Sequence, residues 1–136
     1  MHFFREHIIF IPLIVWVVSV VAKGIYLYIK NQFSVSGAMG SGGMPSVHSA
    51  FVTSISTAVG IKYGIASDLF AICLVFTTII IYDAINVRFE VGLHAKELNK
   101  TKNAEKIFNE SVGHLPQEAF VGSLIGIFVS FALMMI

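Results

Sequence analysis

The residues best suited to chemistry in this chain are two histidines, each at the predicted head of an apolar helix. His48 ends the segment 42–48 (GGMPSVH), in which a glycine-rich turn, a proline and a serine precede a helix. Such a turn exposes backbone N–H groups at the positive end of the helix dipole and can therefore bind an anion. His48 could pass a proton to a group bound there. The same pattern also fits a flexible loop with a capping serine and a histidine at the membrane interface.

The second histidine is His114, four residues before Glu118 at the head of the last apolar segment. Positions four apart lie on one face of a helix. The carboxylate can therefore accept a proton from one imidazole nitrogen and leave the other nitrogen free to attack, as in catalytic triads. An interfacial capping arrangement also fits this pair. The glycines Gly122 and Gly126 in the apolar helix that follows favour the functional interpretation.

A third group of candidates is cationic. Lys23 and Lys30 are seven residues apart, which is about two turns of helix, so they lie on the same side of it. Arg88 follows Asp83 by five residues near the end of another apolar segment. A charge at membrane depth is costly and marks a functional site by default. Alternatively, Lys23 could extend its ammonium group to the interface, and Asp83 could simply pair with Arg88.

The elements that position these residues are about four transmembrane helices in an all-α bundle. Of the 136 residues, 56% are hydrophobic and 12% are charged, whereas a water-soluble domain has about 25% charged residues. A spanning helix needs about 20 mainly apolar residues. We expect a single integral membrane domain over residues 1–136, with spans at about 8–29, 47–63, 65–87 and 116–136. The second span is short and rich in hydroxyl groups, so other helices should shield it from lipid.

Small residues recur every four positions in the second and fourth spans, at Ala50, Ser54 and Ala58 and at Gly122, Gly126 and Ser130. Small residues at this interval let helix backbones approach closely in lipid, so we expect these two spans to touch. The polar connection before the last span contains a predicted amphipathic helix, from about Leu93 to Phe108, at the membrane interface.

Four spans would place the helix ends that carry the candidate residues on one side of the bilayer. That side holds seven lysines and arginines: Lys23, Lys30, Arg88, Lys96, Lys100, Lys102 and Lys106. The other side holds Arg5 and Lys62. An excess of positive charge marks the cytoplasmic side, so we expect a multi-pass membrane protein whose polar face is cytoplasmic. The net charge of +1 argues against nucleic-acid binding, which needs a clustered basic face.

The segments around these candidates resemble the divergent PAP2 family, which is related to acid phosphatases and vanadium-dependent haloperoxidases. The matching stretches are SGGMPSVHSA (41–50), YDAINVRFEVGLHAKELN (82–99) and GHLPQEAFVG (113–122). The resemblance implies a PAP2-like helical core. The wider superfamily carries the motifs K-x6-R-P, P-S-G-H and S-R-x5-H-x3-D. Its members hydrolyse phosphate monoesters or diphosphates, often of lipids, through a phosphohistidine and without a metal or other cofactor.

Carried over position by position, the resemblance implies a catalytic set and a phosphate-binding set. In the first, His114 is the nucleophile, Glu118 its carboxylate partner and His48 the general acid. The second contains Lys23, Lys30, Ser46 and Arg88, with Asp83 and Gly43 in support.

The chain also departs from the superfamily motifs. Val47 replaces the glycine of P-S-G-H, and no proline follows Lys30. Between Arg88 and His114 there are 25 residues, 89–113, where five are usual. His94 would restore the usual spacing, but the residue four positions later is a leucine, which cannot orient an imidazole. We therefore prefer His114 as the nucleophile and keep His94 as the alternative.

The resulting hypothesis is a membrane lipid-phosphate phosphatase that acts on a phosphomonoester or diphosphate in the bilayer. A cytoplasmic site would suit phosphatidate, phosphatidylglycerol phosphate or a prenyl phosphate. Superfamily members usually have six helices, so the pocket of a four-helix chain is either more open or completed by a second copy in a homodimer. Two alternatives stay open. One is a protein of the same fold that binds or transports a phospholipid or anion without turnover. The other is a structural subunit whose polar residues only fix helix packing.

Overall fold

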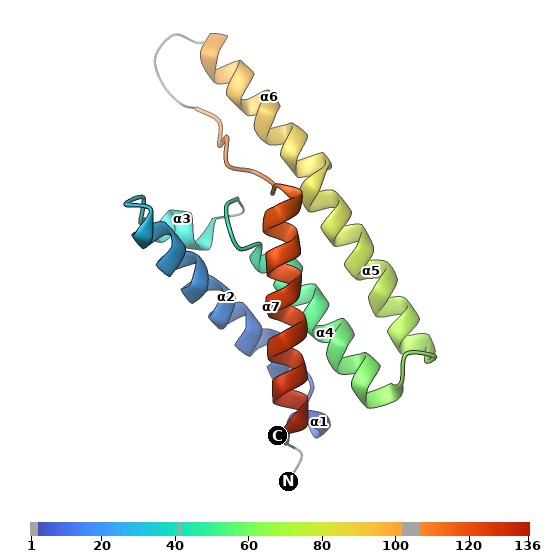
Figure 1. Cartoon of the computed structure of the whole chain (residues 1–136). Coiled ribbons are helices and arrows are strands. Elements are labelled where there is room, and N and C mark those ends of the chain that lie inside the picture. The colour runs from blue at the N-terminus through green and yellow to red at the C-terminus, as the bar shows by residue number, and fades with distance from the viewer. Residues whose placement is uncertain (1–2, 41, 102–106) are drawn as a thin grey trace.

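The protein folds as a bundle of α-helices, and the computed structural model describes residues 3–40, 42–101 and 107–136. Within these residues there is no strand. Figure 1 shows long helices packed side by side and one helix, α6, that leaves the bundle at one end. In chain order the helices are α1 (Phe3–Glu6), α2 (Phe10–Ile29), α3 (Val35–Met39), α4 (Val47–Tyr63), α5 (Asp68–Ile85), α6 (Val87–Thr101) and α7 (Pro116–Met135).

The helices α2, α4, α5 and α7 correspond to the four expected spans. In the described part of the chain, three helical stretches are long and apolar enough to cross a membrane: Phe10–Ile29, Asp68–Thr101 and Pro116–Met135. The fourth helix, α4, has 17 residues, and its buried side chains are mostly small or hydroxyl-bearing. It packs against α2, α5 and α7. The expected shielding of this short, polar helix by its neighbours is therefore observed.

The contact between α4 and α7 is the most extensive in the bundle. Gly126 faces the carbonyl of Ala50, and a Cβ atom at Gly126 or Gly122 would overlap the backbone of α4. One turn further on, the hydroxyl of Ser130 donates a hydrogen bond of 2.9 Å to the carbonyl of Ser54. These are the small residues whose spacing predicted the contact, and the prediction is confirmed.

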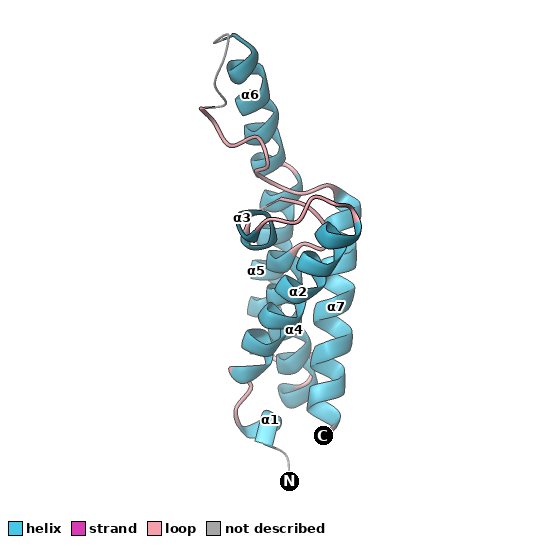
Figure 2. Ribbon diagram, turned by 90° about the vertical axis from the view of Figure 1, so that its left-hand side faces the viewer, coloured by secondary structure: helices cyan, strands magenta, loops and turns pink. Residues whose placement is uncertain are grey.

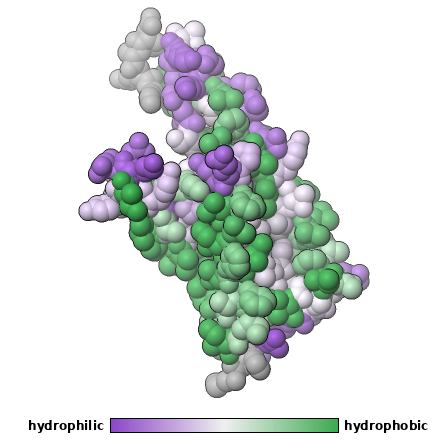
Figure 3. Space-filling model, in the orientation of Figure 1, coloured by the Kyte–Doolittle hydropathy of each residue, from purple (hydrophilic) through white to green (hydrophobic). Residues whose placement is uncertain are grey.

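The two chain termini lie at one end of the bundle, as an even number of spans requires (Figure 1). The opposite end gathers the C-terminal ends of α2 and α5 and the N-terminal ends of α4 and α7. Figure 3 shows apolar surface covering the bundle, and polar surface concentrated at this second end and along α6. The four helix ends that carry the candidate residues therefore share one end of the molecule.

The helix in the polar connection differs from the expected one. It begins at Val87, six residues before Leu93, and follows α5 after a break at Asn86. A helix that continues from another avoids the unfavourable nucleation step, which explains the earlier start. Figure 2 shows α6 projecting beyond the bundle. Of the predicted amphipathic helix from Leu93 to Phe108, residues 102–106 lie outside the described residues, and Ile107 and Phe108 are not helical.

The segment 107–115 returns along α6 to the head of α7. The side-chain amide of Asn99 donates hydrogen bonds of 2.9 Å to the carbonyl of Phe108 and to the Glu110 carboxylate, and its oxygen accepts the Phe108 N–H. Closer to the bundle, Gly92 lies against the backbone of Val112, where a Cβ atom would overlap the carbonyl. The return segment is thus held along its length by α6.

Candidate active site

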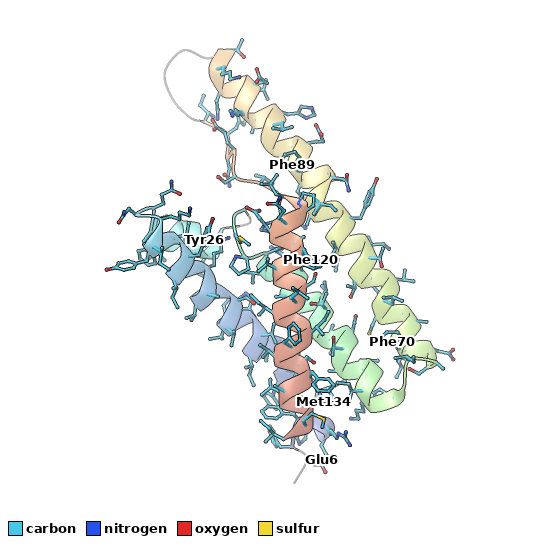
Figure 4. The ribbon with its side chains drawn as sticks, viewed as in Figure 1. Glu6, Tyr26, Phe70, Phe89, Phe120 and Met134 are labelled. Carbon is cyan, nitrogen blue, oxygen red and sulfur yellow. The ribbon has the colours of Figure 1, made fainter. Side chains whose placement is uncertain are left out.

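His114 is positioned by the glycine that precedes it. Gly113 has a φ of +92°, in the left-handed region that favours glycine. It lies so close to the backbone of Arg88 and Phe89 that a Cβ atom would overlap both. The N–H of His114 then donates a hydrogen bond of 2.9 Å to the carbonyl of Ala84. The chain next to His114 therefore lies beside Arg88, at the junction where Figure 4 labels Phe89, although 25 residues (89–113) separate the two in sequence.

His48 is positioned by the cap of α4. The hydroxyl of Ser46 accepts the N–H of Ser49 at 3.3 Å and so starts the helix. The N–H of Ser46 donates to the Glu118 carbonyl at 3.1 Å, which ties the head of α4 to the head of α7. As a result, the imidazole rings of His48 and His114 lie 6.4 Å apart between centroids. Two histidines that are 66 residues apart in sequence, from 48 to 114, face one small volume.

The carboxylate of Glu118 orients the His114 ring. Its Oε2 atom lies 3.1 Å from Nδ1 of His114, and the same oxygen accepts the N–H of Leu115 at 3.1 Å. An ionised carboxylate only accepts hydrogen bonds, so in the neutral ring Nδ1 carries the proton and Nε2 keeps a lone pair. Nε2 is buried and has no hydrogen-bond partner among the described residues. The sequence suggested either that this pair caps the helix or that the carboxylate orients the ring. The Oε2 atom of Glu118 makes both contacts.

The surroundings of His114 favour its neutral form. Only 2% of the residue is exposed, and burial disfavours the charged ring. The pKa of His114 consequently lies below its ordinary value, although the hydrogen bond and negative charge of Glu118 act in the opposite direction. At neutral pH the ring is therefore uncharged, and the lone pair of Nε2 stays unprotonated.

Lys23 contributes a buried positive charge at the same end. The residue is 1% exposed, and its ammonium group donates a hydrogen bond of 2.5 Å to the carbonyl of Gly40. The backbone of Gly43 passes close to its Cε atom, and the charge interacts with those of Glu118, His48 and His114. The ammonium group is therefore enclosed by protein and does not extend to the surface of the molecule. An ammonium group has three N–H donors, and one of them is used by Gly40.

Arg88 and Asp83 form the ion pair that their spacing suggested, with 2.5 Å between Nε and Oδ2. Both side chains are partly exposed. Arg88 also lines, with His48, a cavity of about 480 Å³ whose other walls come from α2, α3, α4 and α5. The pairing with Asp83 thus holds the guanidinium group of a residue that lines this cavity.

A second cavity, of about 340 Å³, lies on the side of α6 and the return segment. Its lining includes Gly42, Gly43, Gly113, Lys96 and Glu118. Since Figure 3 shows polar surface along α6, this cavity gives water an approach to the carboxylate of Glu118.

Three of the residues singled out in the sequence have side chains that lie apart from the His48 and His114 rings. Ser46 is fully buried, and its hydroxyl oxygen is engaged with the N–H and the hydroxyl of Ser49. Lys30 ends α2 in an exposed position with its ammonium group over the ring of Tyr26. His94 is exposed on α6, beyond the junction with α5.

Sequence reasoning passed over other residues that the site depends on. Gly113 is required at the contact with Arg88, and the glycine directly before a histidine was the available signal. The Gly40 carbonyl binds Lys23, for which the sequence offers no signal beyond the glycine-rich composition. In the described part of the chain, no three histidine, cysteine or carboxylate side chains are grouped so that they could hold a metal ion.

The family model of the divergent PAP2 family matches residues 4–129. The chain belongs to this family. It is 33% identical to the uncharacterized membrane protein YuiD of Bacillus subtilis (strain 168), with 85% of each chain covered. No solved structure matches the chain. The apolar helices and this membrane-protein relative together identify the chain as a PAP2-related integral membrane protein.

Proposed function

We propose that this PAP2-related protein is a lipid-phosphate phosphatase that works through a phosphohistidine at His114. The observation that carries the proposal is the 6.4 Å separation of the His48 and His114 rings. Reacting atoms in a near-attack geometry are about 3 to 3.5 Å apart. A single phosphoryl group can contact a nitrogen of each ring only where the two rings lie within several ångströms of each other, and the 6.4 Å between their centroids meets this condition.

The substrate phosphate would be held by cations. Lys23 offers a buried charge beside both histidines, and Arg88 lines the same cavity as His48. Positive groups aimed at the equatorial oxygens of the phosphoryl group stabilise the charge of the transition state. Because the Ser46 hydroxyl caps α4 and Lys30 is exposed, neither belongs to this phosphate-binding set.

In the first step, Nε2 of His114 attacks phosphorus while the bond between phosphorus and the ester oxygen breaks. The N–P bond that forms makes a phosphohistidine, and Glu118 stabilises the positive ring through its Nδ1 proton. His48 donates a proton to the departing alkoxide, which leaves as an alcohol. A general acid in this role contributes typically about 10² to 10⁴-fold in rate.

In the second step, neutral His48 accepts a proton from water, whose oxygen attacks phosphorus as the N–P bond breaks. This step releases inorganic phosphate and restores both rings, so the net reaction consumes one water for each ester. The same histidine acts first as an acid and then as a base, which is the usual alternation in two-step hydrolysis. The cavity beside Glu118 supplies the aqueous approach.

The test is phosphate release from lipid phosphates by the purified protein in detergent. His114→Ala and His48→Ala should both reduce turnover by at least about 10²-fold, and rapid quenching of the parent should trap an acid-labile phosphoprotein. His94→Ala is the matched control, since this exposed histidine lies on α6. If His94→Ala removed the phosphoprotein while His114→Ala kept it, the roles of the two histidines would be reversed.

We further propose that the site faces the cytoplasm. The site end carries the larger share of lysine and arginine, which marks the cytoplasmic side. A Cys73→Ala background with a single cysteine at Lys96 or Lys62 tests the orientation with a membrane-impermeant maleimide. Lys96→Cys should react only in inverted vesicles and Lys62→Cys only in right-side-out vesicles. The opposite pattern would place the site outside.

A second candidate function is anion or phospholipid binding without turnover. It is favoured by one observation, that Nε2 of His114 is covered in this structure. This candidate predicts saturable binding of vanadate, a phosphate analogue, with no release of phosphate from any ester. Steady release that depends on His114 would exclude it.

A further inference from the structure

The cavity beside His48 and Arg88 continues away from them as an apolar groove. The helices α2 and α5 both pack on α4 but make little contact with each other, which leaves the groove between them. Below the two charged groups, its walls are the hydrocarbon side chains of Val20, Val52 and Ile80 with the ring of Phe51. The far end is formed by Trp16, which is 43% exposed, so the groove opens sideways to the lipid.

Apart from the Trp16 indole, the polar groups that the described residues contribute to this groove lie near its head. His48, Arg88 and the backbone of Gly40 line that end, and the Gly40 carbonyl is already bonded to Lys23. Further in, Trp16 at the far end is the only side chain with a polar nitrogen or oxygen atom among the described lining residues. A buried polar group without a partner costs about 1 to 3 kcal/mol. The groove therefore suits a chain that is hydrocarbon from the first carbon after the phosphate.

We infer that the substrate is the phosphate ester of a hydrocarbon alcohol, such as a prenyl or alkyl phosphate, and not a glycerolipid phosphate. The inference rests on the proposed function, because it places the phosphate at His48 and Arg88. A glycerolipid would place its ester carbonyl groups among Val52, Phe51 and Ile80, where the side chains that the structure describes offer no donor. A prenyl or alkyl chain has no such groups and can lie along the groove with its tail in the bilayer.

The length of the groove sets how much of the chain is recognised. Lys23 lies at the level of the groove's head, because its ammonium group binds the carbonyl of Gly40. Trp16 at the far end lies seven residues before Lys23 on α2, which corresponds to about 10 Å at 1.5 Å per residue. An extended hydrocarbon advances about 1.3 Å for each carbon–carbon bond of roughly 1.5 Å. The groove therefore accommodates about eight carbons, and carbons beyond that lie in lipid.

Two measurements test the inference. The first compares kcat/KM for p-nitrophenyl phosphate, for alkyl phosphates of increasing length, for farnesyl phosphate and for dioctanoyl phosphatidate. The efficiency should rise by about two- to fourfold for each added methylene up to about eight carbons and then level off. Farnesyl phosphate should exceed dioctanoyl phosphatidate by at least about tenfold, because the two ester carbonyl groups of the glycerolipid would lie unpaired in the groove.

The second measurement needs no turnover, because Trp16 is the one tryptophan of the chain. An alkyl phosphonate with bromine atoms on carbons seven and eight should quench its fluorescence with saturation. Val20→Phe narrows the groove and should weaken this quenching at least about tenfold. The matched control Val17→Phe changes an exposed position on the same helix and should leave the quenching as in the parent.

The outcomes separate the inference from the proposed function. Quenching that depends on Val20, without phosphate release from any substrate, would support the groove and overturn the phosphatase. Phosphate release with equal or better efficiency on dioctanoyl phosphatidate would support the phosphatase and overturn the hydrocarbon substrate. A steady rise beyond eight carbons that Val20→Phe does not alter would mean that partition into detergent, and not the groove, recognises the chain.

Discussion

Replacing Glu118 with glutamine removes a negative charge from the candidate site while keeping the shape of the side chain. In the protein, the Oε2 atom of Glu118 lies 3.1 Å from Nδ1 of His114 and also accepts the N–H of Leu115. The amide oxygen of a glutamine can accept the same two hydrogen bonds. We therefore expect Glu118→Gln to fold normally and to lose catalytic power.

The size of the loss follows from the separation of the charges. Two unit charges about 3 Å apart interact by roughly 5 kcal/mol at an effective dielectric constant of about 20. The glutamine keeps a neutral hydrogen bond of about 1 to 1.5 kcal/mol. The remaining difference, about 3 to 4 kcal/mol, is available only when the His114 ring becomes positive during attack. It corresponds to a decrease in kcat of about 10² to 10³-fold.

The pH profile distinguishes orientation of the nucleophile from helix capping. Burial lowers the pKa of His114, and Glu118 partly opposes this. In Glu118→Gln the effect of burial is less opposed, so the pKa falls further. Attack requires the neutral ring, which exists above this pKa. The acid limb of kcat should therefore move to lower pH in the variant, while the maximum falls.

The measurement is kcat for phosphate release between pH 4 and 8, next to the melting temperature in the same detergent. Glu97→Gln is the matched control, because it removes an exposed carboxylate that pairs with Lys100 on α6. A Glu118→Gln protein with kcat within a fewfold of the parent and an unmoved acid limb would refute the reasoning. Glu118 would then serve only as the cap of α7.

Three further predictions concern binding, packing and pH. Lys23→Met should weaken vanadate binding at least about tenfold, because a hydrogen bond to a charged group is worth about 1.5 to 3 kcal/mol, whereas the exposed Lys30→Met should change it less than about twofold; equal effects in a binding titration would count against the buried lysine. Gly122→Ala should lower the free energy of unfolding by about 1 to 3 kcal/mol, since the new methyl group overlaps the backbone at the head of α4, while the roomier Gly24→Ala should not; identical denaturation curves would contradict this packing. Lowering the pH below about 6.5 should lower the melting temperature, because the unfolded chain then protonates His114 while burial keeps the pKa of the folded ring lower; His114→Gln should flatten this dependence, and an unaltered slope would disprove it.

The helices and their main contact could be predicted from the sequence because both depend on local patterns. Apolar length defines the spans, and small residues four apart define the surface between α4 and α7. The bounds of α6 could not be predicted in the same way. Its start at Val87 depends on continuation from α5 across Asn86. Hydropathy averaged over a stretch of sequence does not detect that one helix continues from another.

The candidate site could be predicted where its geometry is local. His114 and Glu118 are four residues apart on the chain, and their contact spans the head of α7, where His114 directly precedes the N-cap residue Leu115. Lys30 lies apart from His48 and His114 because of its distance along the helix axis. Seven residues place it on the same side as Lys23 but about 10 Å further along the axis, at the exposed end of α2. Spacing on a helix determines which side of the helix a residue faces. Whether the side chain reaches the site also depends on how far along the helix axis the residue lies.

The split between Arg88 and His114 was the main departure from the superfamily motif, and the structure explains why it need not separate the two residues. The intervening chain leaves the bundle as α6 and returns, so that Gly113 packs on the backbone of Arg88 and Phe89. Extending a loop from five to 25 residues costs only about 1.4 kcal/mol of extra closure entropy. The hydrogen bonds between Asn99 and the return segment, each worth about 0.5 to 1.5 kcal/mol, are enough to offset that cost. An inserted segment that is held together by its own hydrogen bonds can thus lengthen a motif in sequence while the two ends of the motif stay adjacent in space.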